Sequence, residues 1–124
     1  MSSSIHWRET MSPETRWRTY AACWSMSDEE RSGALLTVAD PAVSYRDPAT
    51  NLAGVDELAT YMTSFRTTFP QEHFWIDDVR HHHDRSLARW RQVSADRRTT
   101  MQGISIARHG DDGRFVDIAG FFHE

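Results

Sequence analysis

The sequence predicts a single α+β domain in which three N-terminal helices pack on a strongly curved antiparallel sheet and enclose a cone-shaped pocket. Two observations support this fold class. Apolar residues recur with helical spacing as far as Phe69-Pro70, and from Phe74 onward they alternate with the period of two that is typical of strands. A length of 124 residues suits one domain with one hydrophobic core.

The first helix is predicted to begin after a short N-terminal arm. Residues 1–11 carry no periodic pattern, and we expect a loose arm there, followed by one domain over residues 12–124. Ser12 is a suitable N-cap, and Pro13 suits the first helical position because its missing N–H would have no partner there. A stripe of apolar residues follows with helical spacing: Trp17, Tyr20, Ala21 and Trp24.

A second helix and a short strand are predicted next. Ser27 and Glu30 have the spacing of a capping box, so the second helix begins there, and Asp40-Pro41 is expected to end it. Its apolar side comprises Ala34, Leu35, Val38 and Ala39. Residues 43–47 then form a short strand that stops at Pro48, because proline cannot donate a hydrogen bond to a sheet.

The third helix runs from about Val55 to Phe69 and carries the longest apolar stripe. Pro70 terminates this pattern. The stripe consists of Leu58, Tyr61, Met62, Phe65 and Phe69. Four strands in a meander complete the prediction, at residues 74–83, 87–93, 99–107 and 115–122, separated by short polar turns.

Composition excludes several classes of function. All fourteen basic residues are arginine, and without lysine the chain can form neither a Schiff base nor a phosphate-binding P-loop. Cys23 is the only cysteine, which excludes an intrachain disulfide and a zinc site built from several cysteines. The net charge of −4 and the scattered arginines argue against nucleic acid as a partner. Neither a membrane span nor a secretory signal is visible, so we expect a cytoplasmic protein.

A set of short motifs gives the chain a family resemblance. They are Trp17…Trp24, Asp40-Pro41, Tyr45-Arg46-Asp47-Pro48, Gly54-Val55-Asp56-Glu57-Leu58, Phe69-Pro70, Ala88-Arg89-Trp90 and Asp112-Gly113-Arg114-Phe115…Gly120-Phe121-Phe122. Over residues 12–122 their order resembles the nuclear transport factor 2-like superfamily, in its SnoaL-like branch. The resemblance implies the cone-shaped, cystatin-like α+β fold. Because this fold includes isomerases, cyclases, hydrolases, dehydratases and non-catalytic binders, it does not by itself assign a function.

The resemblance also implies a role for Asp47. A ketosteroid isomerase with the same local pattern uses the aspartate of an Asp-Pro pair as its proton-transferring base, and Asp47 is the matching residue. That enzyme polarises the substrate carbonyl with a tyrosine and a protonated aspartate, at positions that correspond to Cys23 and Ser105 here. The resemblance therefore implies a cavity with a carboxylate at its wall, with neither oxyanion donor preserved.

The residues themselves leave two interpretations of Asp47 open. It lies at a strand end among aromatic neighbours, where loss of water would make the carboxylate a stronger proton acceptor. Alternatively it caps the turn into Pro48 through hydrogen bonds to the backbone. The adjacent Arg46 should point to the opposite face of the strand.

The predicted pocket combines the helix stripes with the inward positions of the strands. Asp47 and Ser105 are among its few polar groups, and one histidine of the run His81-His82-His83 is expected to reach it. A metal shared by that run is not expected, because no third ligand is identifiable. The complete predicted lining is Tyr20, Trp24, Tyr45, Asp47, Met62, Phe65, His83, Trp90, Met101 and Ser105.

The functional prediction is the binding of a small, largely apolar molecule without a cofactor. Asp47 would move a proton next to a carbonyl group, as in isomerisation or aldol cyclisation. The alternative is a non-catalytic ligand-binding or assembly module of the same fold. Arg89 and Arg91 alternate with Trp90, so they should lie on the outer sheet face, through which we expect a homodimer.

Overall fold

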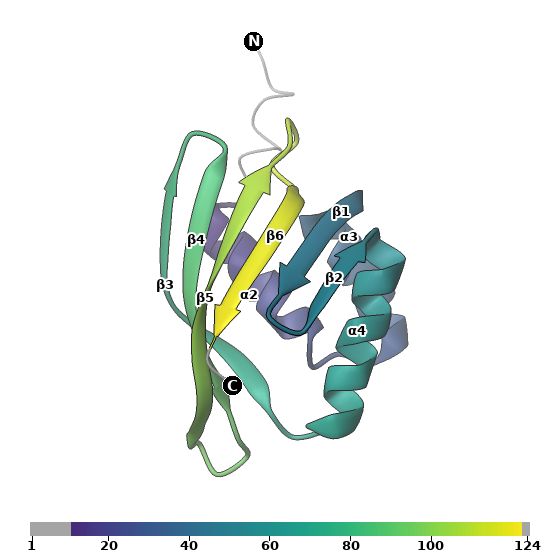
Figure 1. The fold of residues 1–124 in the computed structure, drawn as a ribbon, viewed down its shortest axis with the longest axis vertical. Helices are drawn as coiled ribbons and strands as arrows, with labels where there is room; N and C mark the ends of the chain where they lie inside the picture. Colours follow the sequence, from purple (N-terminus) through teal and green to yellow (C-terminus); the bar gives the residue numbers. More distant parts are fainter. Residues whose placement is uncertain (1–10, 123–124) are drawn as a thin grey trace.

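The computed structural model describes residues 11–122, so the predicted N-terminal arm, apart from Met11, lies outside the described residues. Within these residues, three helices and a six-stranded sheet make up the fold, and the helices lie on one face of the sheet (Figure 1). The helices are α2 (Pro13–Cys23), α3 (Asp28–Val38) and α4 (Val55–Thr68). The strands are β1 (Ala39–Asp47), β2 (Thr50–Ala53), β3 (His73–His82), β4 (Arg85–Val93), β5 (Thr99–His109) and β6 (Phe115–Phe122).

The predicted helix starts and the predicted strand order are confirmed. Ser12 accepts a hydrogen bond from the backbone of Thr15, and Ser27 and Glu30 form both halves of a capping box. The last four strands form the predicted meander, with β3, β4, β5 and β6 paired in sequence. The helix termini and turns are therefore set by local sequence signals, as expected.

The sheet is mixed, which corrects the prediction of a purely antiparallel one. Its order is β2-β1-β6-β5-β4-β3, and β1 and β6 run parallel to each other while the other pairs are antiparallel. The two parallel strands are separated in the chain by β2, α4 and the first three strands of the meander. Side-chain alternation within a strand does not identify so distant a partner, so the sequence pattern could not show this pairing.

The start of the sheet differs from the prediction in two further ways. The strand β1 begins at Ala39, directly after α3, so Asp40-Pro41 lies within the strand, which is longer than the predicted residues 43–47. Its register with β6 shifts between Ala39 and Ser44, which accommodates the proline at an irregular position. The short strand β2 was not predicted; it forms a hairpin in which Asp47 pairs with Thr50 across Pro48-Ala49.

The hydrophobic core lies between the sheet and the helices. Trp17 of α2, Leu58 and Met62 of α4, and Phe115 and Ile118 of β6 are fully buried there. The core closes one part of the space between the layers, and the remaining part is the cavity described below.

One buried cation holds the helices together. Arg31 of α3 is 2% exposed, and its guanidinium donates to the carbonyl oxygens of Cys23 (2.9 Å) and Met26 (2.6 Å). It also donates to the hydroxyl of Thr63 on α4 at 2.8 Å and forms an ion pair with Asp28 at 3.0 Å. This arginine therefore fixes the α2–α3 turn against α4, and with it one wall of the cavity.

Candidate functional site

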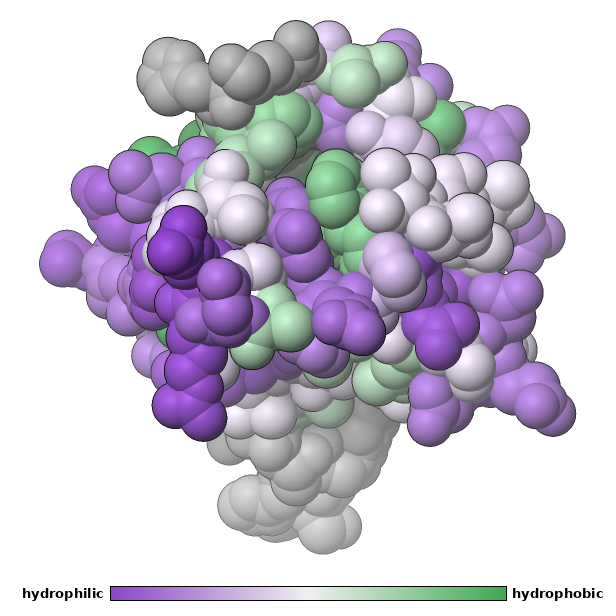
Figure 2. Space-filling model, turned by 90° about the horizontal axis from the view of Figure 1, so that it is seen from below, coloured by the Kyte–Doolittle hydropathy of each residue, from purple (hydrophilic) through white to green (hydrophobic). Residues whose placement is uncertain are grey.

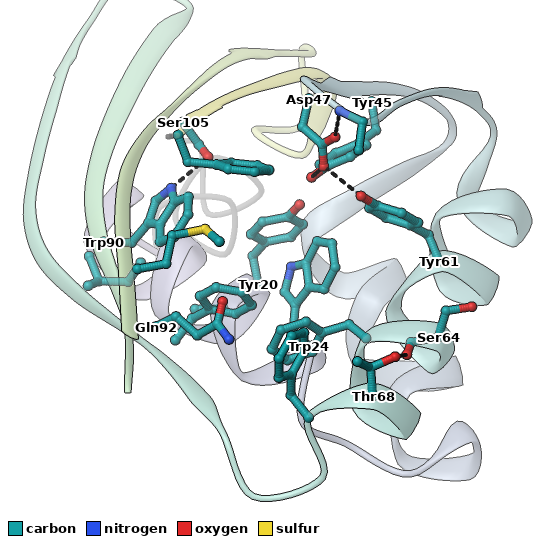
Figure 3. A pocket seen from close by; sticks show the side chains of 18 of the residues that line it. Tyr20, Trp24, Tyr45, Asp47, Tyr61, Ser64, Thr68, Trp90, Gln92 and Ser105 are labelled. Atoms are coloured by element: carbon teal, nitrogen blue, oxygen red, sulfur yellow. Dashed lines mark hydrogen bonds between the residues drawn. The ribbon is translucent and has the colours of Figure 1, made fainter. Parts of the chain in front are cut away.

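A cavity of about 360 Å³ lies between α2 and α4 on one side and the inner face of the sheet on the other (Figure 3). This volume is within the range of small-molecule sites. The end of the molecule shown in Figure 2 has apolar side chains recessed among hydrophilic ones. The cavity is lined by Trp17, Tyr20, Ala21, Trp24, Tyr45, Asp47, Ala49, Tyr61, Ser64, Phe65, Thr68, Phe69, Phe74, Ile76, Trp90, Gln92, Met101, Ser105 and Phe122.

Most of the residues predicted for the pocket lie in this lining. They come from α2, β1, α4, β4 and β5, and the fold brings them around one space. They are Tyr20, Trp24, Tyr45, Asp47, Phe65, Trp90, Met101 and Ser105. Their part in ligand binding stays a prediction.

Two predicted placements are corrected. Met62 is fully buried in the core rather than exposed in the cavity, because the helical stripe that carries it is wider than the cavity wall. His83 lies in the turn between β3 and β4, where it is exposed and has a positive φ of 49°. The strand β3 ends at His82, one residue earlier than predicted. His83 therefore does not follow the alternation of side chains along the strand and does not reach the cavity.

Asp47 has three hydrogen-bond donors around its carboxylate. Tyr45 donates to Oδ2 at 2.6 Å and Tyr61 donates to the same oxygen at 3.0 Å, while the backbone N–H of Ala49 donates to Oδ1 at 2.8 Å. Asp47 therefore caps its turn, as one of the two interpretations expects, and it also lines the cavity, while its role as a proton acceptor stays a prediction. Arg46 points away, as predicted, and forms an ion pair with Asp117 at 2.9 Å.

The tyrosines of the cavity are hydrogen-bond donors at neutral pH. The chain has three tyrosines, Tyr20, Tyr45 and Tyr61, and all of them line the cavity. Burial raises the pKa of Tyr20 and that of Tyr45 well above the usual range, and the nearby Asp47 carboxylate raises both pKa values further. These two phenols therefore stay protonated, and the one on Tyr45 keeps its hydrogen directed at Asp47.

Ser105 lies close to Asp47 across a single glycine. Gly120 of β6 pairs with Ser105, and a Cβ built at Gly120 would lie 3.5 Å from Cβ of Asp47 and 3.5 Å from Oγ of Ser105. Trp90 donates its indole N–H to Oγ of Ser105 at 3.0 Å. Within residues 11–122 no acceptor is found for the hydroxyl hydrogen of Ser105, so it is available to a molecule in the cavity.

A second glycine allows Trp90 to lie against the sheet. A Cβ at Gly103 would lie 2.6 Å from Cζ2 of Trp90, so only glycine accommodates the indole there. The ring of Trp90 also packs edge-on against Phe74 at a centroid distance of 5.2 Å. The indole is thus held in the orientation in which it donates to Ser105.

Cys23 occupies the position at which the resemblance implies a tyrosine that polarises the substrate carbonyl, and its thiol does not replace that phenol. It is completely buried, and burial raises the pKa of its thiol to about 11. A neutral, enclosed thiol is a poor nucleophile and a weak hydrogen-bond donor.

Tyr61 and Gln92 are among the polar lining residues that were not predicted; Ser64 and Thr68 are the others. The positions of Tyr61 and Gln92 in the sequence pattern could have indicated that they line the cavity. Tyr61 belongs to the apolar stripe of α4 and precedes Phe65 by one turn, whereas Gln92 follows Trp90 by two residues and so shares its face of β4.

The cavity lining presents a carboxylate, several hydroxyl groups and an amide. Among residues 11–122, no three histidine, cysteine, aspartate or glutamate side chains are close enough together to hold a metal ion. In the same part of the chain, no helix is long and apolar enough to span a membrane.

The fold is a small α+β domain with a mainly aromatic cavity between its helices and its sheet. A SnoaL-like domain model matches residues 7–118, and the chain belongs to this family. No curated protein sequence matches it significantly.

Solved structures confirm the fold. A proposed isomerase of the SnoaL-like family from Agrobacterium tumefaciens superposes with a TM-score of 0.83 at 23% identity, covering 90% of this chain and 97% of that one. A nuclear transport factor 2-like protein of unknown function from Exiguobacterium has a TM-score of 0.70 at 19% identity, with coverages of 89% and 99%. A proposed polyketide cyclase from Sinorhizobium meliloti has a TM-score of 0.67 at 14% identity, with coverages of 85% and 92%.

Proposed function

We propose that this protein binds a small, largely apolar carbonyl compound in the cavity and that Asp47 moves a proton next to the carbonyl group. The observation that carries the proposal is the position of a carboxylate and a hydroxyl, those of Asp47 and Ser105, on either side of Gly120 in an aromatic cavity. Relatives described as an isomerase and a polyketide cyclase agree with this class of reaction.

The proposed step is a transfer of one proton. The Asp47 carboxylate accepts a proton from the carbon next to the carbonyl, and the electron pair of that C–H bond forms an enolate with charge on oxygen. The hydroxyl of Ser105 then donates a hydrogen bond to this oxygen, and the indole of Trp90 fixes the orientation of the hydroxyl. Return of the proton from Asp47 to another carbon completes an isomerisation. In a cyclisation the enolate carbon instead forms a C–C bond to a second carbonyl carbon, whose oxygen becomes an alkoxide and takes the proton from Asp47.

The second candidate is a binding protein without catalysis. The hydrogen bonds that Asp47 accepts from Ala49, Tyr45 and Tyr61 favour it, because they account for the carboxylate without any reaction. In that case the same cavity holds a ligand, and Asp47 stabilises only the hairpin.

Hydrogen exchange separates the two candidates. The ketone 2-tetralone, an apolar bicyclic compound, is incubated in D₂O with the protein, and deuterium incorporation next to its carbonyl is followed by NMR. The wild-type protein should accelerate exchange, and Asp47→Asn should lower the rate by ~10²-fold or more, the usual scale for a positioned base. Affinity for 2-tetralone, measured by calorimetry, should change little.

The outcomes are distinct. Binding without accelerated exchange in the wild-type protein removes the catalytic proposal and leaves the binding protein. Equal acceleration by the wild-type protein and Asp47→Asn assigns the exchange to another group. A matched control is Asp56→Asn, because Asp56 is exposed in the first turn of α4 and lies outside the cavity lining.

A further inference from the structure

A second polar group lies in the cavity away from Asp47. Gln92 of β4 is 4% exposed and belongs to the cavity lining, and Figure 3 shows its amide pointing into the cavity. Its β5 neighbour in register is Met101, which also lines the cavity. A buried amide in an otherwise aromatic wall requires hydrogen-bond partners, because an unpaired polar group there costs about 1–3 kcal/mol.

One N–H of this amide is bound by Glu72. The Nε2 group of Gln92 donates to Oε1 of Glu72 at 2.5 Å, and the hydroxyl of Thr100 donates to the same carboxylate oxygen at 2.9 Å. A carboxylate accepts but does not donate, so it fixes which end of the amide faces it. Glu72 therefore prevents the amide from turning over.

The other side of the amide is unoccupied. Within residues 11–122 no hydrogen bond reaches Oε1 of Gln92, and this atom is left facing the cavity as an acceptor. Among these residues it has no protein donor, while one of the two N–H groups at the other end is already used by Glu72. The position therefore suits a group that donates a hydrogen bond.

The two polar positions lie at different depths of the cavity. Gln92 is four residues along β4 from Ala88, the partner of Ser105, which corresponds to roughly 13 Å at 3.3 Å per residue. Between them the wall is formed by Trp90 together with Phe74. This spacing matches a rigid bicyclic or larger skeleton with polar groups at its two ends.

We propose that Gln92, held by Glu72, binds a hydroxyl or amine group of the ligand at the end of the cavity away from Asp47. The inference rests on the proposed function in that the cavity holds a small apolar molecule, and it adds a specificity determinant to it. The ligand class is then a flat, mainly apolar molecule with a carbonyl at one end and a hydrogen-bond donor at the other.

The test uses a pair of probes without a carbonyl group. 2-Naphthol carries a donor, and 2-methoxynaphthalene has the same skeleton without one. Calorimetry at neutral pH should show that the wild-type protein binds 2-naphthol ~10-fold more tightly than the methoxy compound. In Gln92→Leu this ratio should fall to about 1, while affinity for the methoxy compound is retained. Gln92→Met is the second variant if the leucine variant does not fold.

A separate pair of variants tests whether Glu72 fixes the orientation of the Gln92 amide. Glu72→Ala frees the amide to turn over and should reduce the 2-naphthol preference severalfold. Glu72→Gln should reduce the preference less than Glu72→Ala, because its carbonyl oxygen still accepts from Nε2 of Gln92 although its own amide can also donate. A merely structural role of Glu72 would change stability in both variants without altering the ratio of the two affinities.

Asp47→Asn separates this inference from the proposed function. The 2-naphthol preference should survive Asp47→Asn, even though 2-tetralone exchange is lost. A preference that survives Gln92→Leu but disappears in Asp47→Asn places the donor at the carboxylate and overturns the inference. Equal ratios in wild type and Gln92→Leu, or no binding of either naphthalene, overturn it as well, whatever the exchange experiment shows.

Discussion

The phenolic oxygen of Tyr45 lies 2.6 Å from Oδ2 of Asp47, two residues further along the same strand. Tyr61 reaches the same oxygen from α4 at 3.0 Å, so the carboxylate joins β1 to the helix that covers it. Tyr45→Phe should lower the free energy of unfolding by about 2 kcal/mol, because a hydrogen bond to a charged group is lost. Denaturant titration measures this loss.

A double-mutant cycle tests whether the loss of unfolding free energy in Tyr45→Phe comes from the hydrogen bond between Tyr45 and Asp47. In an Asp47→Asn background, Tyr45→Phe should cost clearly less than in the wild-type protein, because the charged acceptor is already gone. Additive losses would show that the phenol stabilises the fold independently of Asp47.

Gly120 leaves the space between Asp47 and Ser105 open. Gly120→Ala should fold with nearly unchanged stability, because the new Cβ would make only ordinary contacts of 3.5 Å with both residues. Its methyl group would occupy the space where the carbonyl of a ligand is proposed to lie. We expect the rate of 2-tetralone exchange to fall ~10-fold or more, since small displacements of a reacting group reduce rates strongly.

Gly33→Ala serves as the matched control for that substitution. Gly33 is exposed in α3 and has open space around it, so alanine should raise stability by up to about 1 kcal/mol and leave exchange unchanged. Normal exchange in Gly120→Ala would mean that the ligand does not enter between Asp47 and Ser105.

His109 should make stability depend on pH. Its Nδ1 lies 2.7 Å from the carbonyl oxygen of Gly113 and its Nε2 lies 2.6 Å from Oγ of Ser86, which also accepts from the indole of Trp17 at 2.8 Å. The carbonyl requires a hydrogen on Nδ1, which leaves Nε2 as the acceptor for Ser86. Burial lowers the pKa of His109, Arg16 and His81 lower it further, and Gly113 and Asp84 oppose the shift.

The sign of the effect follows from this lowered pKa. The unfolded chain has the ordinary histidine pKa of about 6.5 and binds the proton more readily than the folded protein. The contribution of neutral His109 is therefore complete above about pH 6.5 and is lost progressively as the pH falls below it. His109→Gln, which cannot titrate, should show a smaller drop in unfolding free energy between pH 7.5 and 5.5, and an identical drop would contradict the assignment.

Arg31 should not be replaceable by lysine. The guanidinium donates in several directions at once, to Cys23, Met26 and Thr63, and an ammonium group cannot reproduce this fork. Arg31→Lys should lower the unfolding free energy by about 3 kcal/mol in denaturant titration, the scale for disrupting a buried charged network. Arg66→Lys on the exposed side of α4 should change it by less than about 0.5 kcal/mol. Similar small effects for both would refute this role.

The outer sheet face is the predicted surface for a homodimer. Trp75 and Phe121 are each 57% exposed, and Ile106 is 39% exposed, so large apolar side chains face solvent on β3, β5 and β6. Sedimentation at micromolar concentration should give twice the chain mass, and Phe121→Asp should reduce it to one chain. A wild-type mass of one chain would contradict the prediction. Arg91, which is also predicted on this face, forms an ion pair with Asp77 at 2.8 Å.

Much of the fold followed from local signals. The cap residues Ser12 and Ser27 start the first two helices, and the change of period after Pro70 separates helices from the meander. The inward parity of Trp90, Met101 and Ser105 was predictable for the same reason, since alternation in a strand fixes which side chains share a face.

The sequence by itself thus determined the helices, the meander, the aromatic character of the cavity and Asp47 as its carboxylate. Tertiary structure alone decided the parallel pairing of β1 with β6, which brings Asp47 beside Gly120 and Ser105. It also decided the donation of Tyr61 to Asp47 and the fixed orientation of Gln92 by Glu72. Such contacts join residues 14 or more positions apart, and periodicity within one element carries no information about which distant side chain will complete a hydrogen bond.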